Sequence, residues 1–245
     1  MASSMSPILL GILSAVFFAA TIFVNATYGA ENGTVSNKYD LCITPAGYAF
    51  SIWGLIYLGL LGFVVMLFVQ PPSNKMMLYD LFWVSCILNA AWIITFTQEW
   101  LYVQAIVILC LAVSLFGLYT QLDNHWLYQS SIALYLGWLL AASALSVSIV
   151  YKYKMSKFID DSQHQVYYVL ALSVVTGVVG IVSYHFQSWV LPLPAVWALV
   201  GILVKNRGVK GTTPVSITSV VVIVLLAVWT VSLAGVGPLK TKVKK

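Results

Sequence analysis

Long apolar blocks, rather than a short repeating period, organise the hydrophobic and polar positions of this chain. About 20 apolar residues are needed for a helix to cross the hydrocarbon core of a bilayer. By that measure we predict eight membrane-spanning helices, over residues 6–27, 46–69, 77–97, 101–121, 127–151, 165–184, 188–204 and 215–236. The seventh is short and contains Pro192 and Pro194, which predicts a kinked or partly re-entrant segment.

The polar segments between these blocks set the topology of the predicted bundle. Those at residues 71–75, 98–100 and 123–125 are short, so the helices that they join are expected to be antiparallel neighbours. Residues 28–44, 152–164 and 205–214 form longer segments and are predicted to be loops. The predicted fold class is therefore all-α, a polytopic transmembrane helical bundle of about eight helices.

Composition strengthens this prediction. Of the 245 residues, 61% are apolar and only 8% are charged, whereas a soluble domain carries about 25% charged residues. So few charged residues cannot cover the surface of a water-soluble protein of this size, so lipid is the solvent that fits. The composition therefore predicts a multi-pass integral membrane protein in contact with the bilayer. The formal net charge is +5, but the basic residues lie in loops and in the C-terminal tail. Without a basic stripe among exposed aromatic residues, we expect no nucleic acid partner.

Several kinds of chemistry lack their signatures in the sequence. No charged residue lies deep in a predicted span, where ion-coupled transporters usually keep such residues. The chain contains no Gly-x4-Gly-Lys-Ser/Thr loop, no His-Glu-x-x-His motif and no Gly-x-Ser-x-Gly motif. We therefore assign no catalytic residue and no metal ligand, and we expect that no cofactor is required.

Three predicted helices each place aromatic or amide side chains on one helical face. Residues three or four positions apart share a face of a helix, and such pairs occur in the second, third and fifth spans. The pairs are Trp53 with Tyr57, Asn89 with Trp92, and Tyr135 with Trp138. They could line an intramembrane pocket for a flat, largely apolar ligand. They could equally be ordinary packing, in which Asn89 bonds to a neighbouring helix and the rings fill gaps.

Small residues recur every four positions in the fifth predicted span, at Ala133, Gly137 and Ala141. Such a stripe allows another helix to approach closely. The approaching helix could belong to a second copy of the chain, forming a homodimer, or to the same chain. The stripe alone leaves both interpretations open.

The aromatic pairs also match sequence patterns of a known family. The patterns are Pro-x7-Trp-x3-Tyr from Pro45 to Tyr57, Leu-Asn-x-x-Trp ending at Trp92, and Tyr-Leu-x-Trp ending at Trp138. In order and in helix number they resemble the tryptophan-rich sensory protein family, which includes the mitochondrial translocator protein (the peripheral benzodiazepine receptor). Nine tryptophans in the chain are in keeping with that resemblance.

The resemblance covers roughly residues 1–150. It implies a five-helix core over residues 1–151, followed by a three-helix extension with a basic tail over residues 152–245. It further implies a cytosolic-side pocket that binds a tetrapyrrole such as protoporphyrin or haem, or a sterol, for sensing or transport. Carried over residue by residue, that ligand site would consist of Trp53, Tyr57, Asn89, Trp92, Tyr135 and Trp138.

Two other functions stay open on the sequence. The three additional helices could complete a pathway, which would make the protein a passive or exchange transporter of a small neutral solute. Alternatively, the protein could be an enzyme that degrades a bound porphyrin, as has been proposed for members of the family that it resembles.

Overall fold

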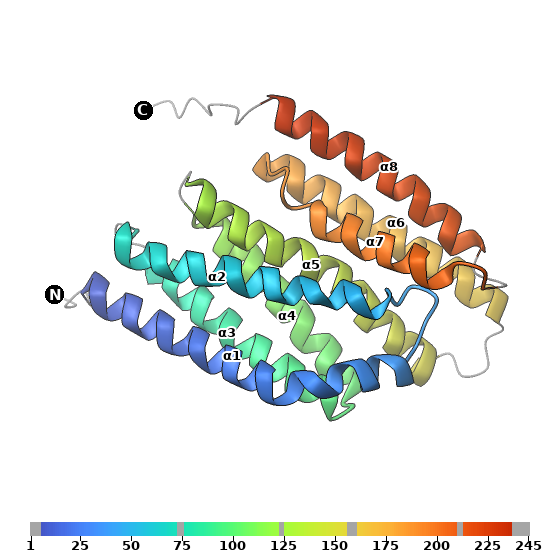
Figure 1. The fold of residues 1–245 in the computed structure, drawn as a ribbon, viewed down its shortest axis with the longest axis horizontal. Helices are drawn as coiled ribbons and strands as arrows, with labels where there is room; N and C mark the ends of the chain where they lie inside the picture. The colour runs from blue at the N-terminus through green and yellow to red at the C-terminus, as the bar shows by residue number, and fades with distance from the viewer. Residues whose placement is uncertain (1–5, 73–75, 123–124, 156–160, 210–212, 237–245) are drawn as a thin grey trace.

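The computed structural model describes residues 6–72, 76–122, 125–155, 161–209 and 213–236. Eight α-helices account for most of them, joined by a short 3₁₀ helix, η1, and a π-helical turn, η2 (Figure 1). Their bounds are α1 Pro7–Lys38, η1 Gly47–Ser51, α2 Ile52–Val69, α3 Met76–Thr97, α4 Leu101–Thr120, α5 Trp126–Val150, η2 Tyr151–Met155, α6 Asp161–Phe186, α7 Leu193–Asn206 and α8 Thr213–Val236. The predicted all-α bundle is confirmed.

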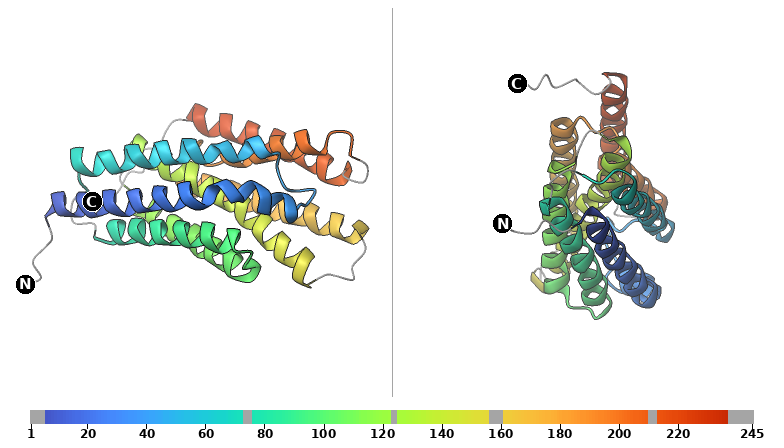
Figure 2. Two further views of the ribbon diagram at one scale, coloured as in Figure 1. Left: turned by 60° about the horizontal axis from the view of Figure 1, so that its bottom comes forward. Right: turned by 90° about the vertical axis from the view of Figure 1, so that its left-hand side faces the viewer.

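The first five helices close into a ring, which we call the five-helix core. Helix α1 packs against α2 and α3, α3 packs against α4, α4 against α5, and α5 back against α2. Helices α6, α7 and α8 form the extension, in which α8 packs on both α6 and α7. Because α5 contacts α6 and α7, it joins the extension to the core, and α8 lies on the far side of the molecule from α1 (Figures 1 and 2). The division near residue 151 stays a prediction, and the basic tail after Val236 lies outside the described residues.

Seven of the helices are long and apolar enough to cross a membrane. Their outer faces carry large apolar side chains that are mostly uncovered by the rest of the described chain. Phe23, Val113, Ile181 and Val231 are each 71% exposed. Water would penalise such a surface, whereas lipid tails solvate it, so the chain is a multi-pass integral membrane protein.

Helix α7 is shorter than the predicted seventh span. Its 14 residues extend about 21 Å at the usual rise, less than the roughly 30 Å of a hydrocarbon core. Pro192 caps this helix and Pro194 lies in its first turn, which explains why it begins part-way along the bundle. The chain nevertheless returns across the bundle here, because α1 begins and α8 ends at the same end (Figure 1).

Helix α1 is longer than predicted. The fall in hydropathy after residue 27 predicts a loop over 28–44, which is wrong for residues 28–38, because the helix continues to Lys38. These last three turns contain several polar residues, and Ser36 among them is buried. The physical reason for the error is that Asn32, Ser36 and Asn37 line a cleft, so the low hydropathy here marks a lined cavity.

Candidate aromatic ligand site

Five aromatic side chains from α2, α3 and α5 converge in the core, and we call them the aromatic cluster. Trp53 lies at the centre. Its ring centroid is 5.7 Å from those of Tyr57 and Trp92, which stack on it, and 5.9 Å and 6.4 Å from those of Tyr135 and Trp138, which meet it edge-on. These distances and orientations are those that aromatic quadrupoles favour. The rings thus face one another instead of the surrounding lipid.

A chain of three polar side chains, the polar layer, crosses the core beside this cluster. The Asn25 amide nitrogen on α1 donates to the Asn89 oxygen on α3 at 2.7 Å. The Asn89 nitrogen in turn donates to the Tyr135 hydroxyl on α5 at 2.5 Å. Asn89 and Tyr135 are almost fully buried, so the layer satisfies an amide that would otherwise be costly in an apolar interior. It also fixes the relative depth of three helices.

A cleft lies against the aromatic cluster, at the end of the bundle where α1 ends and α2 begins. It encloses about 1310 Å³ of empty space, including the part that is open to the outside. Phe50, Trp53, Tyr57 and Trp92 provide its aromatic wall. Helix α1 lines it with Asn25, Asn32, Ser36 and Asn37, and the end of α7 contributes Lys205.

A smaller recess adjoins the cleft and reaches towards α5. Its lining includes Phe50, Trp53, Trp92 and Trp138, together with Asn32 and Ser36. The indole N–H groups of Trp92 and Trp138 are buried and have no hydrogen-bond partner among the described residues. An unpaired buried donor costs about 1–3 kcal/mol. Two such donors beside one recess are therefore the strongest indication of an acceptor-bearing ligand.

The six residues predicted from the sequence fall into two groups. Trp53, Tyr57 and Trp92 line the cleft, and Trp138 lines the recess. Asn89 and Tyr135 are absent from both linings and belong to the polar layer behind the rings. The structure thus combines the two interpretations of the sequence, because four residues face empty space and two hold helices together. Ligand binding by any of the six stays a prediction.

Several lining residues were missed from the sequence, and α1 carries a signal that could have found some of them. Asn25, Gly29, Asn32 and Ser36 follow one another at spacings of four, three and four, and therefore share one helical face. All four line the cleft. Lys205 carries no comparable signal, because its approach to the cleft results from tertiary folding.

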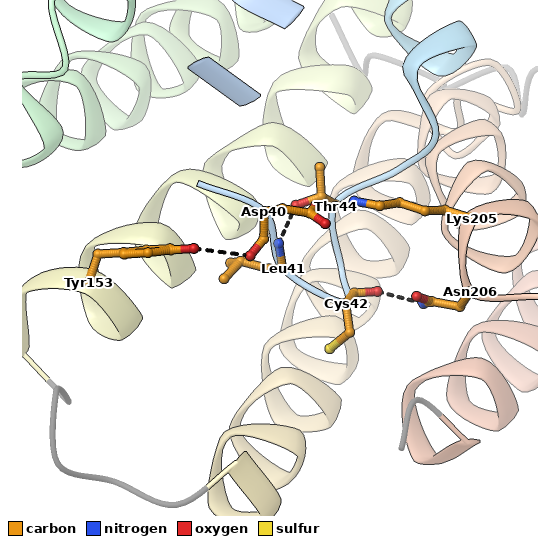
Figure 3. A network of polar contacts seen from close by, with 7 residues as sticks. All are labelled: Asp40, Leu41, Cys42, Thr44, Tyr153, Lys205 and Asn206. Carbon is orange, nitrogen blue, oxygen red and sulfur yellow. Dashed lines mark hydrogen bonds and ion pairs between the residues drawn. The ribbon is translucent and has the colours of Figure 1, made fainter. Parts of the chain in front are cut away.

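Counted along the chain, Lys205 lies 67 positions after Trp138 and 113 positions after Trp92, the nearest predicted residue of the cleft itself. Contacts with residues 39–46, the α1–α2 connection, bring it there. The Asn206 amide donates to the Cys42 carbonyl at 2.6 Å, and the Lys205 ammonium forms an ion pair with Asp40 (Figure 3). The cleft is therefore bordered by both the core and the extension.

The small-residue stripe of α5 explains how the extension comes so close. A Cβ atom added to Gly137 would lie 2.1 Å from the Leu191 carbonyl oxygen and 3.2 Å from Pro194 Cδ. Only glycine permits this approach, so the stripe packs internally against the segment that leads into α7. The alternative interpretation of the stripe, a homodimer interface, gains no support from these residues.

A second exposed ion pair lies at this end of the bundle and joins the end of α1 to the turn between α3 and α4. The Lys38 ammonium at the end of α1 lies 2.5 Å from Glu99 Oε2, between α3 and α4, and the Tyr39 hydroxyl donates to the same oxygen at 2.7 Å. The hydrogen bonds from Lys38 and Tyr39 hold the pKa of the Glu99 carboxyl below its usual value. This pair links the connection after α1 to the turn before α4.

No set of three or more His, Cys, Asp or Glu side chains that could hold a metal ion occurs within the described ranges. The chemistry that the site does offer is stacking on indole and phenol rings, two free indole donors, and amide and hydroxyl groups along α1. The arrangement suits recognition of a flat, apolar molecule with a few acceptor atoms.

Comparison with known families shows to which family the chain belongs. The family model described as TSPO-like protein matches residues 8–232, a range that begins in α1, includes every residue of the aromatic cluster and ends in α8. Comparison with curated proteins and with solved structures gave no match. Since the match spans the core and nearly all of the described extension, the chain belongs to the TSPO-like protein family.

Proposed function

We propose that the cleft and its recess bind a flat lipophilic ligand, either a tetrapyrrole such as protoporphyrin or haem, or a sterol. The observation that carries the proposal is the pair of buried, unpaired indole donors of Trp92 and Trp138 beside the recess. A bound ligand with oxygen or nitrogen acceptors would satisfy them and remove their desolvation cost. Membership of the TSPO-like family supports the same ligand class.

The division of labour among the site residues follows from their positions. Trp53, Tyr57 and Trp92 offer ring faces on which a planar ligand can stack, and Trp138 closes the recess. Asn89 and Tyr135 affect ligand binding indirectly, because their hydrogen bonds set the positions of the helices that carry the rings. We therefore expect substitutions of the first group to affect binding directly and those of the second to act through stability.

We propose a role in sensing the ligand in preference to conducting a solute. The half of the core beyond the polar layer is filled by large side chains of 3% exposure or less, namely Leu60, Phe63, Leu67, Phe82, Leu111, Leu115 and Tyr128. A passive pathway would have to cross this region. We expect proteoliposomes that contain the protein to show no more flux of small neutral solutes than empty liposomes do.

Titration of the purified protein in detergent with protoporphyrin tests the binding proposal. Saturable quenching of tryptophan fluorescence is expected, with a loss of affinity of about tenfold or more in Trp53→Ala or Trp138→Ala, since a base-sized aromatic stack is worth about 1–3 kcal/mol. Trp126→Ala is the matched control, because Trp126 is 70% exposed at the opposite end of α5. Absence of quenching at micromolar protoporphyrin would reject the tetrapyrrole.

A further inference from the structure

We infer that Lys205, at the end of α7, makes the cleft selective for ligands with an anionic edge, such as a carboxylate. The inference rests on the proposed function, because it concerns the same cleft. Among the described residues that line the cleft, Lys205 is the charged one. An ammonium group at the rim of an otherwise aromatic and amide-lined cavity distinguishes an acidic ligand from a neutral one of the same shape.

Helix α7 is held against the core at three successive turns, which places Lys205 firmly. The Trp197 indole donates to the Ala49 carbonyl at 2.8 Å, and the Gly201 carbonyl accepts from the Ala46 amide at 3.1 Å. One turn further on, Asn206 bonds the Cys42 carbonyl. These contacts recur at spacings of four and five residues along α7, so the rim position of Lys205 is built into the fold.

Asp40 occupies the position that a ligand carboxylate would take. In the structure the Asp40 carboxylate is paired with the Lys205 ammonium, and its side chain is 47% exposed (Figure 3). An exposed ion pair of this kind contributes little to stability and exchanges readily. The backbone of Asp40 is held separately, because its carbonyl accepts a 3.3 Å hydrogen bond from the Tyr153 hydroxyl. Its carboxylate can thus give way to another while the connection stays in place.

The location of Lys205 also orients the ligand. The apolar part would stack on Trp53 and Trp92, while the anionic edge would face the rim, where the cleft opens. Further basic residues lie at this end of the bundle, at Lys152 and Lys154 in η2. They raise the local concentration of anions. Among the candidate ligands, this favours a carboxylated tetrapyrrole over a neutral sterol.

The test compares protoporphyrin with its dimethyl ester, which has the same ring but no negative charge. With the full chain in an uncharged detergent, we expect the acid to bind about tenfold more tightly than the ester, as for one hydrogen bond to a charged group. Lys205→Met should lower the affinity for the acid to that for the ester and leave the ester unchanged. Arg207→Met, which removes an exposed basic residue outside the cleft lining, should preserve the preference.

Asp40→Asn provides an independent variant, because it removes the competing carboxylate. It should strengthen binding of the acid by up to about fivefold, the range of an exposed ion pair. Equal affinities of the wild type for acid and ester, or a preference that survives Lys205→Met, would overturn the role of Lys205 and leave the proposed binding function standing. Absence of binding by both ligands would overturn the proposed function and this inference together.

Discussion

The two halves of the five-helix core contain the same helices, yet they are filled in different ways. In the half where α1 begins, the packed half, Phe63 makes ring contacts with Phe82 at 4.9 Å and with Tyr128 at 5.2 Å. All three are buried. In the half where α1 ends, the cleft half, the corresponding stretches of α2, α3 and α5 present Trp53, Trp92 and Trp138 to a cavity. The polar layer lies between the two.

The difference shows where this protein departs from the rules of a stable interior. Close packing favours stability, and the packed half follows that rule around Phe63, although the buried Tyr79 hydroxyl there has no hydrogen-bond partner among the described residues. The cleft half keeps empty space and two unpaired indole donors. Native proteins tolerate such departures mainly at functional sites. The empty space of the cleft half therefore supports a site there independently of any resemblance.

The largest expected effect is on stability alone, in the packed half. Phe63→Ala should cost about 3–5 kcal/mol, because a fully buried ring is removed from a well-packed region. Thermal unfolding in detergent measures the loss, and the affinity of the remaining folded protein for protoporphyrin should be unchanged. Leu61→Ala is the control, since Leu61 is 48% exposed on the outer face of the same helix and should change little. A binding defect as large as the stability defect would contradict the separation of the halves.

The next effect is expected at the polar layer that separates the halves. Asn89→Leu keeps a similar volume but removes the hydrogen bonds that Asn89 makes with the Asn25 amide and the Tyr135 hydroxyl. Interhelical hydrogen bonds in membranes contribute about 0.6–2 kcal/mol, which sets the expected loss of stability. The double variant with Asn25→Leu should cost less than the sum of the two single variants, since both remove one hydrogen bond. Simple additivity would show that the two amides act separately.

The sequence was sufficient to predict the helical bundle and to indicate which aromatic and amide side chains share a helical face. Hydropathy defines most helix bounds to within a few residues, since lipid-facing helices must be apolar along their length. The spacing of Asn89 and Trp92, and that of Tyr135 and Trp138, puts each pair on one helical face, and in the structure these side chains contact one another or Trp53. Helical periodicity is a local property, so a single sequence is enough to detect it.

The cleft itself was harder to predict, for two physical reasons. The polar end of α1 resembles a loop in a hydropathy profile, because a helix that lines a cavity loses the apolar character of a span. Lys205 reaches the cleft only through the docking of α7 on the α1–α2 connection. Such long-range contacts depend on the complete fold, and no local sequence pattern around Lys205 predicts them.

A smaller effect should distinguish the tryptophans of the two halves. Trp83 in the packed half donates its indole N–H to Ser14 Oγ at 2.9 Å, whereas the Trp138 N–H has no partner among the described residues. Trp83→Phe should therefore destabilise by about 1 kcal/mol for the lost hydrogen bond, in addition to lost packing. In Trp138→Phe, release of an unpaired donor should offset the packing loss and leave stability within about 1 kcal/mol of wild type. Unfolding of the ligand-free protein measures both.

Ligand addition completes this comparison. If the Trp138 donor bonds to the ligand, Trp138→Phe should weaken protoporphyrin binding, while Trp83→Phe should leave it unchanged. A strongly destabilised ligand-free Trp138→Phe variant would indicate that a partner satisfies this donor in the protein alone. Unchanged affinity in Trp138→Phe would remove the indole N–H from the recognition of the ligand.

The smallest effect concerns the exposed ion pair at the rim of the cleft half. The folded-state pKa of Glu99 lies below its unfolded value because Lys38 and Tyr39 bond the carboxylate. A lowered pKa means that the stabilisation is fully present above the unfolded pKa and is lost as the pH falls through the folded pKa. Glu99→Gln should therefore lower the unfolding temperature slightly at about pH 7 and not at all at about pH 2. High salt should reduce the difference at neutral pH, since both side chains are accessible to solvent. A difference in unfolding temperature that persists in acid would show that Glu99 stabilises the rim by packing and not by its charge. The rim would then be stabilised in the same way as the packed half.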